Sequence, residues 1–222
     1  MVLGEIIEKF KSLFIAGGIA TGAAAGAIGG YHYYPVDNTQ EDLGDPSKFR
    51  YSPTSSIEGI FIHHVAGDMT PQEIDDMHQD MFNSGGISYT NFFDNGRTYY
   101  TSPWDLKKAQ ASKMNTVSRG LVFNGNYEVE KPSEEDLAQF EIQLFSILRV
   151  FPHIQWVRPH NQNIYSQTLC PGKYLEEELR KRGLFFESRA EIDQWLRKME
   201  MRLLNPCMDE RLEDIFIDGE PC

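Results

Sequence analysis

Short apolar runs of strand length alternate with amphipathic helical segments over most of the chain, and this alternation limits the possible folds more than any other feature. The predicted strands are Ile57–His64, Tyr89–Phe93, Thr98–Thr101, Gly120–Asn124 and Ile154–Val157. The predicted helices run from Thr70 or Pro71 to Phe82 and over Ser133–Phe151, Tyr174–Arg182 and Ser188–Leu204. Strands mixed with flanking helices predict an α/β fold with a central mixed β-sheet.

Two local signals predict where some of these elements begin and end. Asp94-Asn95-Gly96 lies between two strand-like runs, which is typical of a tight β-hairpin turn. Pro132 and the pattern Ser133-x-x-Asp136 predict the start of the long helix, because a serine at this position can cap the first free backbone N–H groups.

Composition excludes several classes of protein. The 222 residues are 41% hydrophobic and 24% charged, which is typical of a globular protein with one main domain. A formal net charge of -12 would repel a phosphate backbone, so nucleic acid is not an expected partner. Three cysteines are too few for a disulfide scaffold.

The chain divides into four stretches. Residues 1–36 form a hydrophobic segment, and the polar, turn-rich residues 37–56 are interpreted as a linker. Residues 57–175 are the main domain. Residues 176–222 are a helical C-terminal extension with an acidic tail, which we interpret as solvated.

Two histidines and one cysteine have the arrangement of a catalytic metal site. His63 and His64 end a predicted strand, and only one of them can face a given site because successive side chains alternate. His160 follows a later strand, and Cys170 lies ten residues further on, before Pro171-Gly172. Three such ligands leave a fourth position open, as in catalytic zinc sites. Spacing alone is weak evidence, since a single cysteine is more often a buried apolar residue.

The order of these motifs is more specific than their spacing. Ile60-Phe61-Ile62-His63-His64, Ser88-Tyr89 before the hairpin, Gly120-Leu121-Val122-Phe123-Asn124-Gly125, His160 and Cys170-Pro171-Gly172 follow one another in the chain. Over residues 57–175 this resembles the type 2 N-acetylmuramoyl-L-alanine amidase family, which includes phage endolysins and peptidoglycan recognition proteins.

The resemblance implies a zinc amidase domain and a specific set of site residues. His63, His160 and Cys170 match the zinc ligands, and Tyr89 and Thr168 match the catalytic positions. Two departures are evident. Thr90-Asn91 stands where the family often has His-Phe, which predicts a different groove floor, and the interval from His160 to Cys170 is long, which predicts a bulged loop.

The function implied is zinc-dependent cleavage of the amide between N-acetylmuramic acid and L-alanine of peptidoglycan, in a phage or prophage endolysin. All three ligands are retained, whereas binding-only members typically lose one. Two alternatives remain open, a catalytically inactive peptidoglycan-binding module and a virion-associated structural protein. The expected location is the periplasm or inner membrane of an infected bacterium, or the virion. Host, stem-peptide preference and oligomeric state stay undetermined.

The hydrophobic residues 1–36 allow three interpretations. The apolar part, Leu13–Gly30, would span ~27 Å as a helix, close to the ~30 Å of a bilayer core. It could be a cleaved signal peptide, a membrane anchor with glycines four apart on one face, or a signal-anchor-release segment, which it resembles. Cys207 and Cys222 either pair in an oxidising compartment or remain free thiols.

Overall fold

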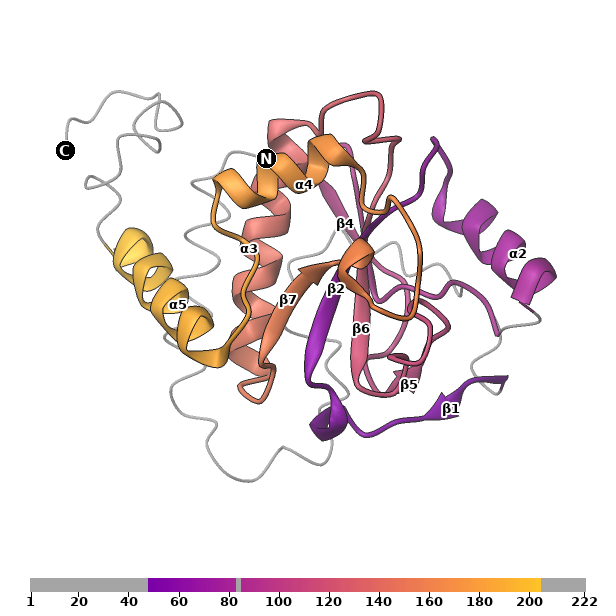
Figure 1. Ribbon diagram of the computed structural model, residues 1–222, viewed down its shortest axis with the longest axis horizontal. Helices are drawn as coiled ribbons and strands as arrows, with labels where there is room; N and C mark the ends of the chain where they lie inside the picture. Colours follow the sequence, from indigo (N-terminus) through magenta and orange to yellow (C-terminus); the bar gives the residue numbers. More distant parts are fainter. Residues whose placement is uncertain (1–47, 83–84, 205–222) are drawn as a thin grey trace. The chain divides into compact units, whose positions relative to one another are not determined.

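The computed structural model of the chain describes residues 48–82 and 85–204 (Figure 1). The predicted membrane-associated segment, residues 1–36, lies outside them, as do Cys207 and Cys222. Within the described ranges, no helix combines the length and the apolar character that a bilayer crossing requires. Of the described residues, 48–192 belong to one compact unit and 193–204 to a second.

The described elements form two sheets and a set of helices. In chain order they are β1 (Arg50–Tyr51), η2 (Thr54–Ser56), β2 (Gly59–His64), α2 (Pro71–Phe82), β3 (Asn91–Asp94), β4 (Arg97–Tyr100), β5 (Leu106–Lys107), β6 (Ser118–Phe123), α3 (Glu134–Val150), β7 (Trp156–Pro159), η3 (His160–Gln162), α4 (Lys173–Lys181) and α5 (Arg189–Leu204). The main sheet has the order β4-β3-β6-β2-β7, and β1 pairs with β5 in a small second sheet. Only the β3–β4 hairpin of the main sheet is antiparallel, so the predicted mixed sheet is confirmed.

Helices cover both faces of the main sheet (Figure 1). Phe92 and Val122 face α2, where they pack with Ile74. The next residues along the same strands point to the opposite face, because side chains alternate in a strand. There Phe93 and Phe123 pack against Phe140 of α3, with ring centroids 5.3 and 5.1 Å away. Central strands buried on both sides explain the continuous apolar runs in the sequence.

Both local signals identified in the sequence are present. Asn95 and Gly96 form the hairpin turn with φ angles of 51° and 69°, in the left-handed region that such turns require. Ser133 is the N-cap of α3, and its Oγ accepts a hydrogen bond from the backbone N–H of Asp136 at 3.0 Å. The last strand lies at Trp156–Pro159, two residues later than the range predicted for it.

The folded body extends into the range interpreted as a linker. β1 and η2 both lie within residues 37–56, and the Ser52 N–H donates to the Asp105 C=O at 2.7 Å. β1 and β5 have only two residues each, which is too short for a periodic apolar pattern to form. Their pairing therefore depends on tertiary contacts that the local sequence does not encode.

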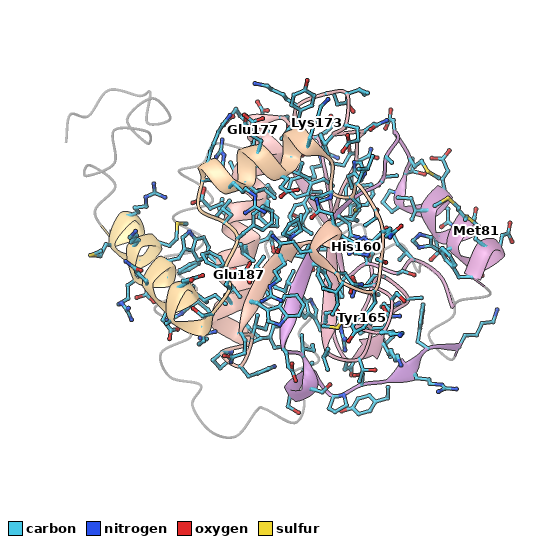
Figure 2. The ribbon with its side chains drawn as sticks, viewed as in Figure 1. Met81, His160, Tyr165, Lys173, Glu177 and Glu187 are labelled. Carbon is cyan, nitrogen blue, oxygen red and sulfur yellow. The ribbon has the colours of Figure 1, made fainter. Side chains whose placement is uncertain are left out.

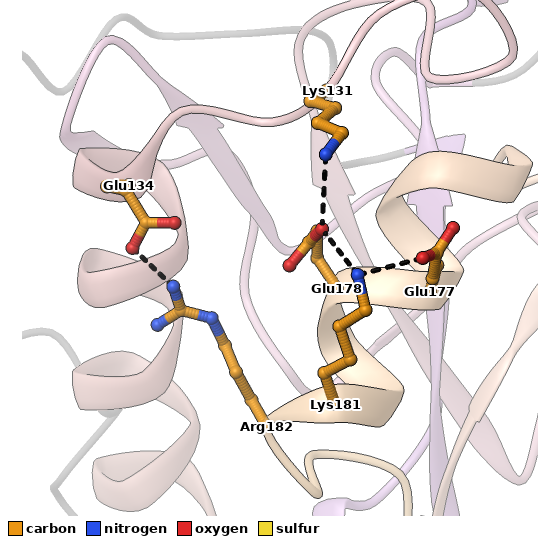
Figure 3. Close-up of polar contacts among 6 residues, drawn as sticks. All are labelled: Lys131, Glu134, Glu177, Glu178, Lys181 and Arg182. Atoms are coloured by element: carbon orange, nitrogen blue, oxygen red, sulfur yellow. Dashed lines mark hydrogen bonds and ion pairs between the residues drawn. The ribbon is translucent and has the colours of Figure 1, made fainter.

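Helix α4 crosses the boundary predicted between residues 175 and 176. Its apolar side chains, Leu175 and Leu179, are fully buried. On its exposed side, Lys181 pairs with Glu177 and Glu178, and Arg182 reaches Glu134 at the start of α3 (Figure 3). Exposed ion pairs of this kind contribute little to stability, so the buried leucines hold the helix in place.

Removing the cap of α3 is expected to destabilise the fold. The Ser133→Ala variant should lower the free energy of unfolding by about 1 kcal/mol, because the Asp136 N–H loses its acceptor. Urea denaturation measures this change. Ser146→Ala is the matched control, since the Ser146 hydroxyl donates to the Ile142 carbonyl inside the same helix and caps no free N–H. Equal losses in both variants would contradict a capping role.

Candidate metal centre

Three side chains from separate parts of the chain converge at one edge of the main sheet. His63 lies near the end of β2. His160 follows β7 directly, in η3 (Figure 2). Because β2 and β7 are parallel neighbours, their carboxyl ends share an edge. Cys170 joins them from the loop before α4. One ligand atom from each of the three residues lies within 4.8 Å of the others.

The loop from His160 to Cys170 closes on itself. The backbone N–H of Asn161 donates to the Cys170 C=O at 2.7 Å, which brings the two ends of the loop together. Between them, the Asn163 side chain is almost fully buried, and its Nδ2 donates to the Ser112 C=O at 3.1 Å. The residues of this long interval therefore bulge outward while His160 and Cys170 stay adjacent.

His63 and His64 face opposite sides of the sheet. The His63 ring packs against His160 and Tyr89, with centroids 4.3 and 5.1 Å away. His64 points to the other side, where its Nδ1 accepts from the Tyr127 N–H at 3.3 Å. Its backbone still serves the site, because the His64 N–H lies 3.4 Å from Cys170 Sγ and can donate to it. The structure therefore groups His63, and not His64, with the other two candidate ligands.

The donor set fits a zinc ion. Burial, followed by the nearby His160, holds the pKa of His63 well below its usual value, and burial lowers the pKa of His160 to about 4. Both rings are then neutral and can each offer a lone pair. His160 Nε2 is buried and has no hydrogen-bond partner among the residues described, as expected of a ligand nitrogen. One thiol and two imidazoles are ligands that zinc prefers.

Cys170 is a protonated thiol in the protein without metal. Burial raises its pKa to about 12, and the hydrogen bond from the His64 N–H opposes this rise. A bound cation would instead favour the deprotonated form of Cys170, since a coordinating thiol loses its proton. With a cation bound, the His64 N–H would donate to a thiolate, and the charged acceptor would strengthen that hydrogen bond.

Tyr89 lies beside one of the candidate ligands, with its ring centroid 5.1 Å from that of His63. Its backbone C=O accepts hydrogen bonds from the hydroxyls of Thr101 at 2.8 Å and Ser102 at 2.9 Å, so its position is fixed. Among the described residues none accepts a hydrogen bond from its own hydroxyl, which can therefore serve a ligand. Burial, and secondarily Cys170, raise the pKa of the phenol, so it stays protonated at neutral pH and acts as a donor.

Thr168 is attached to the site through Cys170. Thr168 lies two residues before Cys170 in the chain and is half-buried. The backbone N–H of Cys170 donates to Thr168 Oγ1 at 3.1 Å, which holds the hydroxyl close to the cysteine. Its proton stays available for a second hydrogen bond. The Thr168 hydroxyl is thus held near the cysteine, whereas the ring of Tyr89 contacts the histidine side of the group.

The two unusual residues after Tyr89 lie inside the protein. Thr90 and Asn91 are both fully buried, and the Thr90 hydroxyl donates to the Gly120 C=O at 3.0 Å. Neither side chain is exposed, so any effect of this departure on the floor of a groove is indirect, through packing beneath it. The Thr90 hydroxyl is thus satisfied within the core, whereas Nδ2 and Oδ1 of Asn91 are buried without a hydrogen-bond partner among the described residues.

Two residues that sequence reasoning did not single out complete the site. Gln110, on the loop before β6, accepts a hydrogen bond from His63 Nε2 at 2.8 Å. Gly120 lies against Gln110, His63 and Tyr89. A Cβ at this position would be 3.1 Å from Tyr89 Cδ1, 3.2 Å from Gln110 Oε1 and 3.2 Å from His63 Cδ2. Gly120 was identified as the start of a strand and of a matching motif but not as a site residue, and Gln110 lies in an irregular segment without a pattern.

Adding a methyl group at Gly120 is expected to disturb this packing. Gly120→Ala should cost about 1–3 kcal/mol of unfolding free energy, because three site side chains must shift to admit the Cβ. Thermal and urea denaturation with a chelator present measure the effect without metal. Gly67→Ala is the control, since a Cβ there meets nothing within 4 Å. The steric argument fails if both variants unfold alike.

Of three comparisons with known proteins, only the comparison with solved structures finds matches. No protein-family model matches the sequence, and no curated protein matches it. Solved structures do match. The endolysin N-acetylmuramoyl-L-alanine amidase LysCS from Clostridium intestinale URNW has a TM-score of 0.55 and 23% identity, covering 62% of this chain and 90% of its own.

Peptidoglycan recognition proteins match equally well. Drosophila PGRP-LB has a TM-score of 0.55 and 21% identity, covering 64% of this chain and 90% of its own. Peptidoglycan recognition protein-LE, solved with a monomeric diaminopimelic acid-type peptidoglycan, has a TM-score of 0.54 and 21% identity. The match covers 60% of this chain and 84% of that protein. The predicted resemblance is thus confirmed in the architecture: the chain has the fold of the type 2 amidase endolysins and peptidoglycan recognition proteins.

Proposed function

We propose that the protein is a zinc-dependent N-acetylmuramoyl-L-alanine amidase that cleaves the amide joining N-acetylmuramic acid to L-alanine in peptidoglycan. The observation that carries this proposal is the group of His63, His160 and Cys170, whose ligand atoms lie within 4.8 Å of one another. Three ligands of this kind leave a coordination position open for water or substrate.

The side chains around the ligands have complementary roles. His63, His160 and Cys170 would hold the zinc ion, which would supply Lewis acidity and lower the pKa of a bound water to about 7. Tyr89 keeps its proton at neutral pH and donates a hydrogen bond to the scissile carbonyl oxygen as negative charge develops there. Thr168 can donate to the same oxygen, but it carries no positive charge, so it stabilises this charge by hydrogen bonding alone.

Two proteins of similar fold support peptidoglycan as the substrate. LysCS is named as an endolysin amidase, and recognition protein-LE was solved with a peptidoglycan fragment. The second of these also favours a second candidate function, a peptidoglycan-binding module without catalysis. The complete ligand set favours the amidase, because binding of a glycopeptide alone does not require a metal with an open position.

Phage or prophage lysis is the setting that we propose for this activity. The hydrophobic composition of residues 1–36 supports contact with a membrane before release to the wall, in the periplasm or at the inner membrane. A virion-associated enzyme is the alternative. Fractionation of infected cells and of purified particles distinguishes the two, since a free endolysin is absent from particles.

The amidase is tested by incubating the full-length protein with isolated sacculi and identifying the released fragments by mass spectrometry. Free stem peptides that begin with L-alanine, lost on chelation and restored by zinc, are the expected products. Sacculus binding without any released peptide, in protein shown to contain zinc, would overturn catalysis and favour the binding module.

A further inference from the structure

Two side chains behind His63 form a chain of hydrogen bonds whose direction can be followed from one end. The backbone C=O of Met114 only accepts, so the Ser118 hydroxyl, 2.8 Å away, donates to it. The Ser118 oxygen in turn accepts from Gln110 Nε2 at 2.8 Å. Gln110 therefore directs its carbonyl oxygen at His63, whose Nε2 lies 2.8 Å from it.

This direction determines which nitrogen of His63 carries the proton. An amide oxygen only accepts, so His63 must donate through Nε2–H, and the lone pair of its neutral ring lies on Nδ1. Nδ1 is also the nitrogen that faces Cys170, with Sγ 3.6 Å away. The hydrogen-bond chain therefore leaves the lone pair of His63 on the side of the other two candidate ligands.

Water cannot easily replace either member of the chain. Gln110 is 7% exposed and Ser118 only 1% exposed. The loop that carries Gln110 is anchored next to it, because the Ala111 N–H donates to Asn115 Oδ1 at 2.7 Å. The Asn163–Ser112 hydrogen bond ties the same loop to the segment between His160 and Cys170.

We propose that Gln110, oriented by Ser118, is a positioning residue that keeps His63 in the Nε2–H form and directs Nδ1 at a bound metal ion. The proposal rests on the proposed function, since it requires His63 to be a zinc ligand. Partners that accept the second N–H of a metal-bound histidine typically change metal affinity by about 10–100-fold.

The test compares zinc affinity in full-length variants by competition with a chromophoric chelator. Gln110→Met keeps the size of the side chain but removes the strong acceptor, and should weaken zinc binding by about 10–100-fold. Gln110→Glu keeps an acceptor for His63 Nε2–H and should bind zinc close to the wild-type level. Gln143→Met is the matched control, because Gln143 is fully buried in α3 and has no partner among the described residues.

Two further measurements keep the proposal falsifiable if Gln110→Met does not fold. Ser118→Ala removes the group that orients Gln110 and should also weaken zinc binding, by a smaller factor. Nitrogen-15 NMR of the metal-free wild-type protein should show His63 protonated at Nε2 and bare at Nδ1.

The outcomes separate this proposal from the proposed function. Wild-type zinc affinity in folded Gln110→Met, or a proton on Nδ1 of His63 in the wild-type protein, overturns the positioning role and leaves the amidase intact. A wild-type protein that binds no zinc overturns both. Equal losses in Gln110→Met and Gln143→Met also overturn the proposal, because they would show a general effect of altering a buried glutamine.

Discussion

Zinc retention and amide cleavage are expected to be lost together when Cys170 is replaced by serine. The substitution changes one atom, but it removes the thiolate that zinc prefers and leaves two histidine ligands. Metal catalysis contributes several kcal/mol to such reactions, and each ~1.4 kcal/mol is a factor of ten, so peptide release should fall by about a thousandfold or more. Metal analysis of purified protein and mass spectrometry of sacculus digests measure the two losses.

The same chemical change at another position provides the control. Cys207→Ser lies outside the described residues and should retain zinc and activity, measured under reducing conditions. The folded state of Cys170→Ser is checked by denaturation in the presence of a chelator, where the thiol is protonated and its loss should cost little. Cys170→Ser protein that still releases stem peptides would contradict the assignment of this residue as a ligand.

The sequence predicts most of the fold because its strongest signals are local. The Asn95-Gly96 turn and the Ser133 cap are each decided by a few adjacent residues, and both are present. Apolar runs that are buried on both faces identified β2 and β6. The short strands β1 and β5 were missed, because their pairing is determined by residues distant in the chain.

The candidate site likewise contains residues that the sequence predicts and residues that it does not. The three candidate ligands were selected by residue type and motif order, and the structure brings them together. Gln110 was missed because its role depends on a distance to His63 across 47 residues and on the direction of a hydrogen-bond chain. The burial of Thr90 and Asn91 was not foreseen, since proximity in sequence to Tyr89 does not show which side chains are buried.

Removing the Tyr89 hydroxyl should reduce catalysis while leaving zinc in place. Tyr89→Phe keeps the ring that packs on His63, at a centroid distance of 5.1 Å, and removes only the donor. Loss of one preorganised donor to a developing oxyanion typically lowers kcat by about 10²–10³-fold. Because burial keeps the phenol protonated, we expect the loss to be nearly constant across neutral and mildly alkaline pH.

The control for this variant is Tyr99→Phe, which makes the same change on a tyrosine that packs edge-on against Phe92 in the sheet. Its activity should match the wild type. If Tyr89 served only as a strand aromatic, both variants would keep full activity, and the donor role would be rejected. If Tyr89→Phe instead lost zinc, the residue would be acting through the ligands. Zinc content therefore has to be measured with the rate, because only a slow enzyme that retains its metal identifies the hydroxyl as a catalytic donor.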